Sequence, residues 1–554
     1  AVAGALALEE FLTAAIIGLM LATGQYLESY AAGRAERELT ALVERAPRTA
    51  HRLVADRIET ISIDDVDRGD RLMVKPGEVV PVDGIIISGV AVLDEAALTG
   101  ESIPVERTEG ARVASGVVNA AGPFELRALT TAAEGTYAGV IRLVRQAQEE
   151  RYPAVRLADR WAAWFVPLAL GIAALAWAVS GDPVRGLAVL VVATPCPLLL
   201  AVPIAIVSGI SRAARKGVIF RGGGALEVLA RTEVLLLDKT GTLTTGEPAI
   251  RRVTTFARGL DANEALRLAA AVDQASTHVL ARALVAEAHR RGLHLPVPSA
   301  VEEVAGGGVV GEVEGRIVSV GNAAWVLGDQ EEPEAVAEFR REIQRMAPLT
   351  VFIAIDGDVV AGASFDDVIR PDAASTVRAL RRVGIKRIVM ATGDHPVVAQ
   401  SVGLAVGIDS VLAECTPAEK VAALQDLRRD GVTAMVGDGI NDAPALAAAD
   451  VGVAMGARGA TASSEAADVV LMVDRLQRLV TAIEIARRSR RIALQSVIIG
   501  MGMSFAAMIA AAFGLLPPIA GALVQEAIDV IAIMSALRAL TGDRPLAGTP
   551  RLSP

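Results

Sequence analysis

The sequence has few cysteines, few aromatic residues and no excess of positive charge. Among its 554 residues only Cys196 and Cys415 are cysteines, which excludes a fold held together by disulfides. Aromatic residues make up 3% of the chain, and 54 basic side chains are outnumbered by 64 acidic ones, giving a net charge of −10. Basic runs with interleaved aromatic residues are lacking, so we expect no nucleic-acid partner.

Hydrophobic residues are concentrated in a few parts of the chain. The mean hydropathy is +0.44 although 21% of the residues are charged, a combination that an ordinary soluble fold would not give. Four charge-free runs approach or exceed the length needed to cross about 30 Å of hydrocarbon: Phe11–Leu27, Trp161–Gly181, Gly186–Ser211 and Ile492–Gln525. The last run contains Gly514 and Pro517-Pro518, so we expect two helices there, the second ending near Leu540. The sequence therefore predicts about five membrane spans.

Charges beside these runs predict which segments lie in the cytoplasm. Arginines and lysines follow the first and third runs, precede the fourth and end the fifth span. By the positive-inside rule, residues 38–155 and 215–485 are cytoplasmic. The alternative, buried helices of a large soluble protein, is disfavoured because the two longest runs exceed ordinary core helices. The odd number of spans, with Ala1 as first residue, favours an amino-terminally truncated sequence over a signal peptide.

The two cytoplasmic segments differ in pattern. From Ile61 to Leu129, short β-branched runs alternate with Gly, Pro and Asp turns, which predicts a small, mostly β domain. From Thr232 to Asp474, apolar strand-like runs end in Asp- or Gly-rich turns followed by Ala-rich helical stretches, which indicates a parallel α/β sheet. A less regular α+β insertion lies between residues 250 and 355.

Three strand ends in the α/β region carry residues suited to phosphate chemistry. The runs Val234–Leu237, Ile388–Met390 and Ala434–Val436 lead into DKTGT, TGD and GDGIND, respectively. In a parallel sheet, reactive groups gather at the carboxyl ends of the strands. An aspartate presented there, beside backbone N–H groups and acids that could hold Mg²⁺, suits nucleophilic attack on a phosphoryl group.

These three motifs, DKTGTLT, TGD and GDGINDAPAL, resemble those of P-type ATPases, whose phosphorylation domain is of the haloacid-dehalogenase-like type. The resemblance implies that Asp238 is the nucleophile that forms an aspartyl-phosphate from ATP. Asp438, with the backbone of Thr240, would hold Mg²⁺. Thr392 would donate to a phosphate oxygen and Lys420 would neutralise the phosphate, while Asn441 and Asp442 would complete the site.

The resemblance extends to the β-rich domain and to the insertion. Thr99-Gly100-Glu101-Ser102 matches the dephosphorylation loop of the family's actuator domain, so Glu101 would orient the water that attacks the aspartyl-phosphate. The family binds ATP in the insertion, which implies a nucleotide site formed by Asp273, His278, Gly306, Gly308, Gly321 and Asn322. Two positions depart from the family pattern, because Val279 replaces a proline and Asp273 replaces a glutamate.

Two polar groups inside the apolar runs point to a transported metal. In Thr194-Pro195-Cys196-Pro197, two prolines break the backbone hydrogen-bond ladder of the third run around a thiol. This resembles the Cys-Pro-x motif of heavy-metal-transporting P-type ATPases in a Thr-Pro-Cys variant. In the fifth span Gln525, Glu526 and Asp529 lie within about one helical turn, and carboxylates in hydrocarbon indicate function. Pairing with Arg538 is the structural alternative.

The types of donor atom limit which metal ion the protein would transport. One thiol with carboxylates and an amide suits borderline divalent ions such as Ni²⁺, Co²⁺, Fe²⁺ or Zn²⁺ better than Cu⁺, which favours several sulfurs. The motifs resemble a minor subclass associated with nickel and iron. Met501, Met503 and Ser504 are further candidate ligands, although methionine more often serves packing. We expect Cys415 to be structural, and the sequence does not identify metal donors.

These observations predict a multidomain membrane protein with a helical transmembrane bundle, a mostly β actuator domain, a haloacid-dehalogenase-like α/β phosphorylation domain and an α+β nucleotide-binding insertion. The expected order is a transmembrane helix and stalk at 1–38, the actuator at 39–155, two transmembrane helices with the metal motif at 156–215, the phosphorylation domain at 216–250 and 356–485, the nucleotide-binding domain at 251–355, two transmembrane helices at 486–541 and a tail at 542–554.

The expected function is ATP-driven export of a divalent metal across a bacterial plasma membrane, with the soluble domains in the cytoplasm. Two alternatives remain open. A membrane-anchored phosphatase would use Asp238 without transport, but would give no reason for TGES or for carboxylates in the fifth span. A pump for alkali or alkaline-earth cations would have all-oxygen ligands and make Cys196 incidental.

Overall fold

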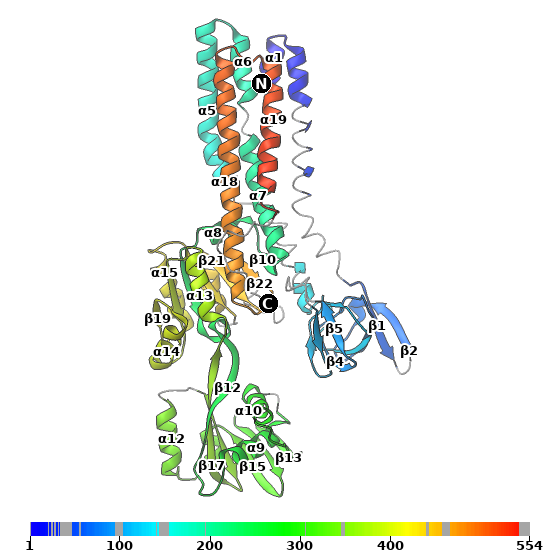
Figure 1. Ribbon diagram of the computed structural model, residues 1–554, viewed down its shortest axis with the longest axis vertical. Helices are drawn as coiled ribbons and strands as arrows, with labels where there is room; N and C mark the ends of the chain where they lie inside the picture. Colours follow the sequence, from blue (N-terminus) through cyan, green and yellow to red (C-terminus); the bar gives the residue numbers. More distant parts are fainter. Residues whose placement is uncertain are drawn as a thin grey trace. The chain divides into compact units, whose positions relative to one another are not determined.

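The computed structural model describes most of the chain as two compact units, residues 1–232 with 450–554 and residues 233–449 (Figure 1). The described ranges are 2–19, 47–54, 57–94, 104–139, 155–193, 196–276, 278–304, 306–328, 330–344, 349–438, 442–456 and 466–541, with isolated positions between 22 and 33 and at 141–142. For residues 155–163, 196–200 and 247 only the backbone is described.

The first unit contains a bundle of apolar helices (Figure 1). They are α1 (Val2–Ala7), α5 (Val155–Ser180), α6 (Pro183–Val192), α7 (Cys196–Ala214), α18 (Gln477–Ala512) and α19 (Pro518–Leu537). Helix α6 begins where Asp182 accepts a hydrogen bond from the Val184 N–H, with Pro183 at the first helical position. Gly186 lets α6 approach α5 closely, because a Cβ there would lie 3.1 Å from the carbonyl oxygen of Ala173.

Helices α5, α6, α7, α18 and α19 follow the second, third and fourth charge-free runs. The fourth run divides as predicted, since α18 ends at Ala512 and α19 begins at Pro518. The third run is interrupted where Pro195 and Pro197 predict a break, since α6 ends at Val192 and α7 begins at Cys196. Within the described residues, α18 and α19 are the 2 helices long and apolar enough to cross a membrane. The first predicted span, Phe11–Leu27, lies partly outside the described residues. The parts of α5 and α7 whose side chains are described, at 164–180 and 201–214, are apolar over shorter stretches, as is α6 at 183–192.

Large apolar side chains cover the outer faces of these helices. Trp164 is 81% exposed, Val179 80% and Phe513 74%. In a soluble protein these apolar side chains would be exposed to water, at a large cost in free energy. Contact with the hydrocarbon of a membrane carries no such cost. The exposed side chains therefore agree with a membrane bundle.

The mostly β domain predicted between Ile61 and Leu129 is present. One sheet has the strand order β2-β1-β3-β9-β4-β7 and a smaller one β6-β5-β8, with antiparallel pairing throughout. The strands are β1 (Thr49–Val54), β2 (Arg57–Ser62), β3 (Arg71–Val74), β4 (Gly84–Ser88), β5 (Ala91–Asp94), β6 (Val105–Arg107), β7 (Arg112–Val113), β8 (Val118–Asn119) and β9 (Phe124–Ala128). Alternate residues such as Leu72 and Val74 are buried, as a half-covered sheet requires.

Three further strands and a helix belong to the first unit. They are β10 (Val218–Phe220), α8 (Gly223–Arg231), β21 (Val451–Met455) and β22 (Val469–Leu471). Strand β22 pairs antiparallel with β10 and parallel with β21. All three strands are completely buried.

The second unit is built on parallel strands, as predicted. The order β20-β11-β18-β19 places β11 (Val234–Asp238) between β20 (Thr433–Gly437) and β18 (Arg387–Ala391), with β19 (Ser410–Leu412) beyond β18. Every residue of β11 and β20 is buried, which explains why both read as continuous apolar runs. The accompanying helices are α13 (Ala373–Arg382), α14 (Pro396–Val406), α15 (Pro417–Leu427) and α16 (Ala443–Ala448).

The insertion forms a second sheet of six antiparallel strands in the order β12-β17-β16-β15-β14-β13. Its elements are β12 (Thr244–Thr255), α9 (Ala262–Asp273), α10 (Val279–Arg290), β13 (Ser299–Val304), β14 (Gly308–Val313), β15 (Arg316–Gly321), α11 (Ala323–Leu327), α12 (Glu334–Gln344), β16 (Leu349–Ile355) and β17 (Asp358–Ile369). The long strands β12 and β17 extend past both predicted ends of the insertion.

Helices cover both faces of this sheet (Figure 1). Val351 and Ile353 of β16 pack into the core formed with α9 and α10, whereas Phe352 between them packs against Phe339 of α12. This alternation has the period of two that a strand covered on both sides shows. The insertion is therefore α+β, as predicted.

Candidate active site

Asp238 lies at the carboxyl end of β11, where neighbouring parallel strands also end. Leu237 pairs with Val436 of β20, and Asp238 itself pairs with Ala391 of β18. Asp438 follows β20, and Thr392 follows β18. The sheet thus brings together three motifs that are far apart in the sequence.

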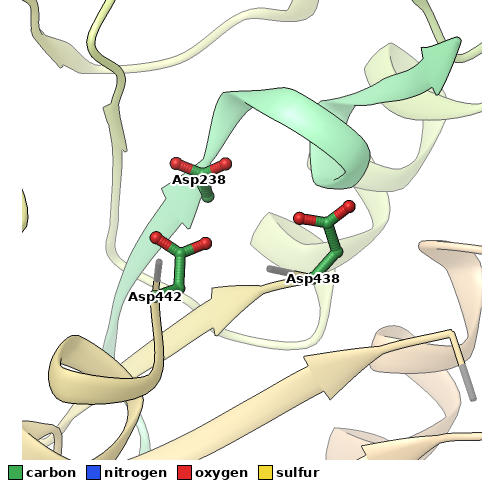
Figure 2. Close-up of side chains that lie close together, drawn as sticks. All are labelled: Asp238, Asp438 and Asp442. Carbon is green, nitrogen blue, oxygen red and sulfur yellow. The ribbon is translucent and has the colours of Figure 1, made fainter. Parts of the chain in front are cut away.

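Three carboxylates converge at this edge. One carboxylate oxygen from each of Asp238, Asp438 and Asp442 lies within 4.8 Å of the others (Figure 2). Lys420 of α15 is buried beside them, with its Nζ 2.5 Å from Asp238 Oδ1 and 2.7 Å from Asp442 Oδ1. The site therefore combines a strand-end aspartate, two further acids and one ammonium group.

Electrostatics leave this cluster short of positive charge. Burial, reinforced by the charge of Asp442, raises the pKa of Asp238 to about 7, although Lys420 acts in the opposite direction. Burial would lower the pKa of Lys420, but the charges and hydrogen bonds of Asp238 and Asp442 raise it above its usual value. Mg²⁺ prefers oxygen ligands, and these three carboxylates provide them. The donor set and its charge therefore fit a magnesium ion.

Two glycines make room for the carboxylates. Gly241, in the irregular turn Lys239–Leu243, has a φ of +70°, and a Cβ on it would lie 1.4 Å from Asp438 Oδ2. A Cβ on Gly437 would lie 2.5 Å from Asp442 Oδ2. Any other side chain at these positions would displace an acid of the cluster.

A second group of residues beside the turn was not identified from the sequence as part of the site. Lys239 forms an ion pair with Asp394 and lies 3.9 Å from Asp367, at the end of β17. Asp367 also accepts hydrogen bonds from Thr244 Oγ1 at 2.5 Å and from the Gly246 N–H at 3.1 Å. Asp394 belongs to the TGD motif, but Asp367 lies within a strand of the insertion and carries no local motif signal.

Arg370 is a further unexpected contact of the turn. Its side chain is buried, and Nη2 donates a hydrogen bond of 2.8 Å to the Gly241 carbonyl. Thr392 is also buried, and its Oγ1 accepts a hydrogen bond from the Asp394 N–H at 3.1 Å. Both residues hold the backbone at the strand ends.

All six predicted nucleotide-binding residues line one cavity of about 260 Å³ in the insertion: Asp273, His278, Gly306, Gly308, Gly321 and Asn322. Asp273 ends α9, and burial together with the charge of Glu303 raises its pKa to about 7. His278 is the N-cap of α10, its Nδ1 accepting a hydrogen bond from the Leu280 N–H at 3.3 Å.

The glycine-rich wall of this cavity packs against Trp325, a residue that was not predicted to belong to the site. A Cβ on Gly307 would lie 2.7 Å from the Trp325 ring, one on Gly308 2.8 Å from it, and one on Gly321 2.6 Å from it. Ser276 donates a hydrogen bond of 3.1 Å to Glu303, another lining residue that was not predicted. The indole of Trp325 therefore forms the support for the glycine-rich wall.

Polar side chains meet between α18 and α19 in the first unit. Ser504 Oγ donates to Gln525 Oε1 at 3.2 Å, and Gln525 Nε2 donates to Asp529 Oδ1 at 2.9 Å. All three side chains are buried, and Oε2 of Glu526 is buried without a hydrogen-bond partner. Buried polar groups of this kind in an apolar bundle suit the binding of a cation.

Several predicted residues fall outside this description. Glu101 and Asn441 lie outside the described residues, as do Thr194 and Pro195. Cys196 is placed as the first residue of α7, but its side chain is not described. Cys415 follows β19, and its backbone N–H donates to the Thr392 carbonyl at 2.9 Å.

Comparison with known proteins gives the same assignment for the α/β region and for the β-rich region. Residues 232–450 match the haloacid dehalogenase-like hydrolases, and residues 44–145 match the P-type ATPase actuator domain. A protein of Mycobacterium tuberculosis named "Probable copper-exporting P-type ATPase V" is 39% identical over 540 residues, covering 95% of this chain and 70% of the relative. A zinc-transporting ATPase of Bacillus subtilis is 36% identical over 499 residues, covering 88% and 78%.

A solved structure is similar over most of the chain. The crystal structure of a zinc-transporting PIB-type ATPase in the E2.Pi state matches with a TM-score of 0.66 and 34% identity. The match covers 97% of this chain and 89% of that one.

Proposed function

Since the chain belongs to the heavy-metal-transporting P-type ATPases, we propose that it uses ATP to pump a divalent transition-metal ion and that Asp238 carries the phosphoryl group during the cycle. The observation that carries the role of Asp238 is its position at the end of β11, beside Lys420 and two further carboxylates. Among the described residues, no other group of three or more acidic, histidine or cysteine side chains brings its ligand atoms this close together.

The first half of the cycle is phosphorylation. A carboxylate oxygen of Asp238 attacks the γ-phosphorus of ATP, the bond to the bridging oxygen breaks, and ADP leaves. Asp238 must be ionised to attack, and Lys420 favours that state despite the burial of the carboxyl group. Asp438 and Asp442, with the backbone of Thr240, would hold Mg²⁺, which screens the charge of the phosphoryl oxygens. Thr392 would donate to one of those oxygens.

The nucleotide site lies in the insertion. Asp273, His278, Gly306, Gly308, Gly321 and Asn322 line its cavity, which supports the proposal that they bind the adenosine part of ATP. The glycines present backbone groups to the cavity, and His278 offers a flat ring beside them.

The second half of the cycle is hydrolysis. We assign the orientation of the attacking water to Glu101 on the strength of its TGES motif. The assignment rests on the family match of residues 44–145, which includes this position. In this step the water oxygen bonds to phosphorus and the acyl-phosphate bond breaks, which restores the Asp238 carboxylate.

The transported ion is assigned from the donors in the bundle. Gln525, Glu526 and Asp529 supply oxygen ligands and Cys196 a single thiolate, which together suit Ni²⁺, Co²⁺, Fe²⁺ or Zn²⁺. The buried oxygen of Glu526 that lacks a hydrogen-bond partner supports this proposal. Export from the cytoplasm of a bacterial cell, through the plasma membrane, is the direction and location we propose.

A metal panel on the ATPase activity of the full chain tests the proposal. We expect at least one of these four ions to stimulate hydrolysis, and Asp238→Asn to abolish the stimulated activity. Stimulation that survives Asp238→Asn would contradict it, and stimulation by Cu⁺ alone would overturn the choice of ion. The relatives are named as metal transporters, which leaves the alternatives of a simple phosphatase and of an alkali-cation pump without support.

A further inference from the structure

The second unit contains a larger cavity beside the turn Lys239–Leu243, which follows Asp238 and is called the phosphorylation turn below. It has a volume of about 840 Å³ and is lined by Lys239 and Thr240 of that turn and also by Val279, the neighbour of His278. If ATP binds as proposed, with adenosine near His278 and its γ-phosphate at Asp238, the triphosphate must cross this cavity. The inference below therefore rests on the proposed function.

The charges that line this cavity are mostly negative. Asp366, Asp367 and Asp394 are acidic, while Lys239 and Arg251 are the cationic lining residues. Lys239 is already engaged by Asp394 and lies 3.9 Å from Asp367. A polyanionic triphosphate would be repelled unless a cation faced it, and Arg251 is the cation on the β12 wall.

Arg251 owes its position to an irregularity of the strand. Ile250 pairs with Phe365 of β17 and Arg252 pairs with Ser364, so the register shifts by one residue between them. Arg251 is therefore the extra residue of a β-bulge. Bulges redirect side chains and are frequent beside active sites.

Arg251 is held only loosely by its partner. Its Nη1 lies 3.3 Å from Asp366 Oδ2 and 3.5 Å from Oδ1, and the two side chains are 48% and 43% exposed. Exposed ion pairs of this kind contribute little to stability. A guanidinium can exchange such a partner for phosphate oxygens, which it binds in the same forked geometry.

We propose that Arg251 binds the triphosphate of ATP, and that Asp366 holds the side chain in place when no nucleotide is bound. Asp366 then competes with the nucleotide for the same guanidinium. Removing the arginine should weaken ATP binding, and removing the competing carboxylate should strengthen it.

The test measures ATP binding and ATPase kinetics of the full chain with Arg251→Ala, Asp366→Asn and, as matched control, Arg252→Ala. Arg252 is the next residue of β12, with an exposed ion pair of its own to Glu342 at 3.4 Å. We expect Arg251→Ala to raise KM and Kd for ATP about tenfold, as for loss of a charged hydrogen bond, with kcat within about twofold. Asp366→Asn should lower both constants about twofold to threefold, and Arg252→Ala should leave them unchanged.

Adenosine serves as the probe that separates the triphosphate from the base. Its affinity should be the same in wild type and Arg251→Ala, because the cavity around His278 is intact. The inference would be overturned if Arg251→Ala weakened the binding of adenosine as much as that of ATP. It would also be overturned if Arg251→Ala and Arg252→Ala changed the affinity for ATP equally. Failure of the proposed function is distinguishable, since the wild type would then show no metal-stimulated ATPase activity at all.

Discussion

At the scale of single residues, Lys420 is the group on which the phosphorylation site depends most. It is buried between Asp238 and Asp442, so its loss would leave three carboxylates together without their ammonium partner. Removing one partner of a buried ion pair costs about 3–5 kcal/mol. Lys420 is therefore needed for stability as well as for the proposed chemistry.

We expect Lys420→Ala to lower the free energy of unfolding by about 3–5 kcal/mol without divalent cations. Added Mg²⁺ should recover part of this loss, because it can replace the missing charge among the three acids. Thermal unfolding with and without Mg²⁺ measures both effects. Lys386→Ala, which removes an exposed pair with Glu233, is the control. Equal unfolding temperatures for Lys420→Ala and wild type would contradict the assignment.

Asp273 predicts a pH dependence of stability. Its pKa of about 7 in the folded protein exceeds the usual 3.8, so the folded state binds more protons than the unfolded state between these values. The wild type should therefore lose stability as the pH rises from about 4 to 7. Asp273→Asn lacks this loss. Relative to wild type, its free energy of unfolding should therefore increase across that range, by on the order of 2–4 kcal/mol in total.

Tryptophan fluorescence during denaturant unfolding measures this difference, because Trp325 packs against the wall of the same cavity. Asp358→Asn, at an exposed position at the start of β17, controls for removal of an acid. A constant difference between Asp273→Asn and wild type from pH 4 to 7 would show that Asp273 is not a buried titrating group.

Much of the site could be predicted at this scale, because its residues follow strand ends in recognisable motifs. Asp238, Asp438, Asp442 and Lys420 were named from the sequence, and the structure places them in contact or close together. Asp367 could not be found in this way, since its contacts with Thr244 and Lys239 arise only when β12 and β17 pair.

At the scale of elements, the turn that follows β11 is the most constrained segment. Gly241 is required there twice, by its φ of +70° and by the proximity of Asp438. Arg370 holds the same turn through the Gly241 carbonyl. The turn thus fixes Asp438 relative to Asp238.

We expect Gly241→Ala to abolish phosphorylation of Asp238, because the new Cβ must displace the Asp438 carboxylate. The insertion should remain folded and keep its affinity for adenosine. Labelling with ATP and equilibrium binding of adenosine check these two outcomes. Gly259→Ala, at an exposed turn with a positive φ and open space, reports the backbone strain alone. Phosphorylation of Gly241→Ala at the wild-type rate would refute the role of this turn.

Helices α18 and α19 carry a second prediction. Asp529→Asn should remove metal stimulation of ATP hydrolysis while ATP affinity stays unchanged, because the buried carboxylate is a proposed metal ligand. Ser535→Ala is the control, since Ser535 also lies on α19 and bonds Ser496 of α18 at 2.9 Å. The ATPase rate is measured over a range of metal concentrations. Similar stimulation in Asp529→Asn and wild type would remove Asp529 from the metal site.

Elements were predicted best where the residue pattern is local. Strands β11, β18 and β20 lie within one residue of the predicted runs, since buried parallel strands are continuously apolar. The interruption of the third apolar run was predicted from Pro195 and Pro197, and α6 ends at Val192 while α7 begins at Cys196. The sequence did not show the bulge at Arg251, which depends on pairing with β17.

At the scale of the whole molecule, the two proposed sites lie in different units. The phosphorylation and nucleotide residues belong to residues 233–449, whereas Gln525, Glu526 and Asp529 belong to the unit that includes 450–554. A pump requires that metal binding in one unit changes the chemistry in the other. This coupling distinguishes the proposed function from simple hydrolysis of ATP.

Phosphorylation of the full chain by ATP carrying a labelled γ-phosphate tests this coupling most directly. We predict that a divalent metal from the Ni²⁺, Co²⁺, Fe²⁺ and Zn²⁺ group increases label on the wild type, that Asp238→Asn takes up none, and that Asp529→Asn is labelled independently of the metal. Label on Asp238→Asn, or label on the wild type that never responds to any of these metals, would contradict the account.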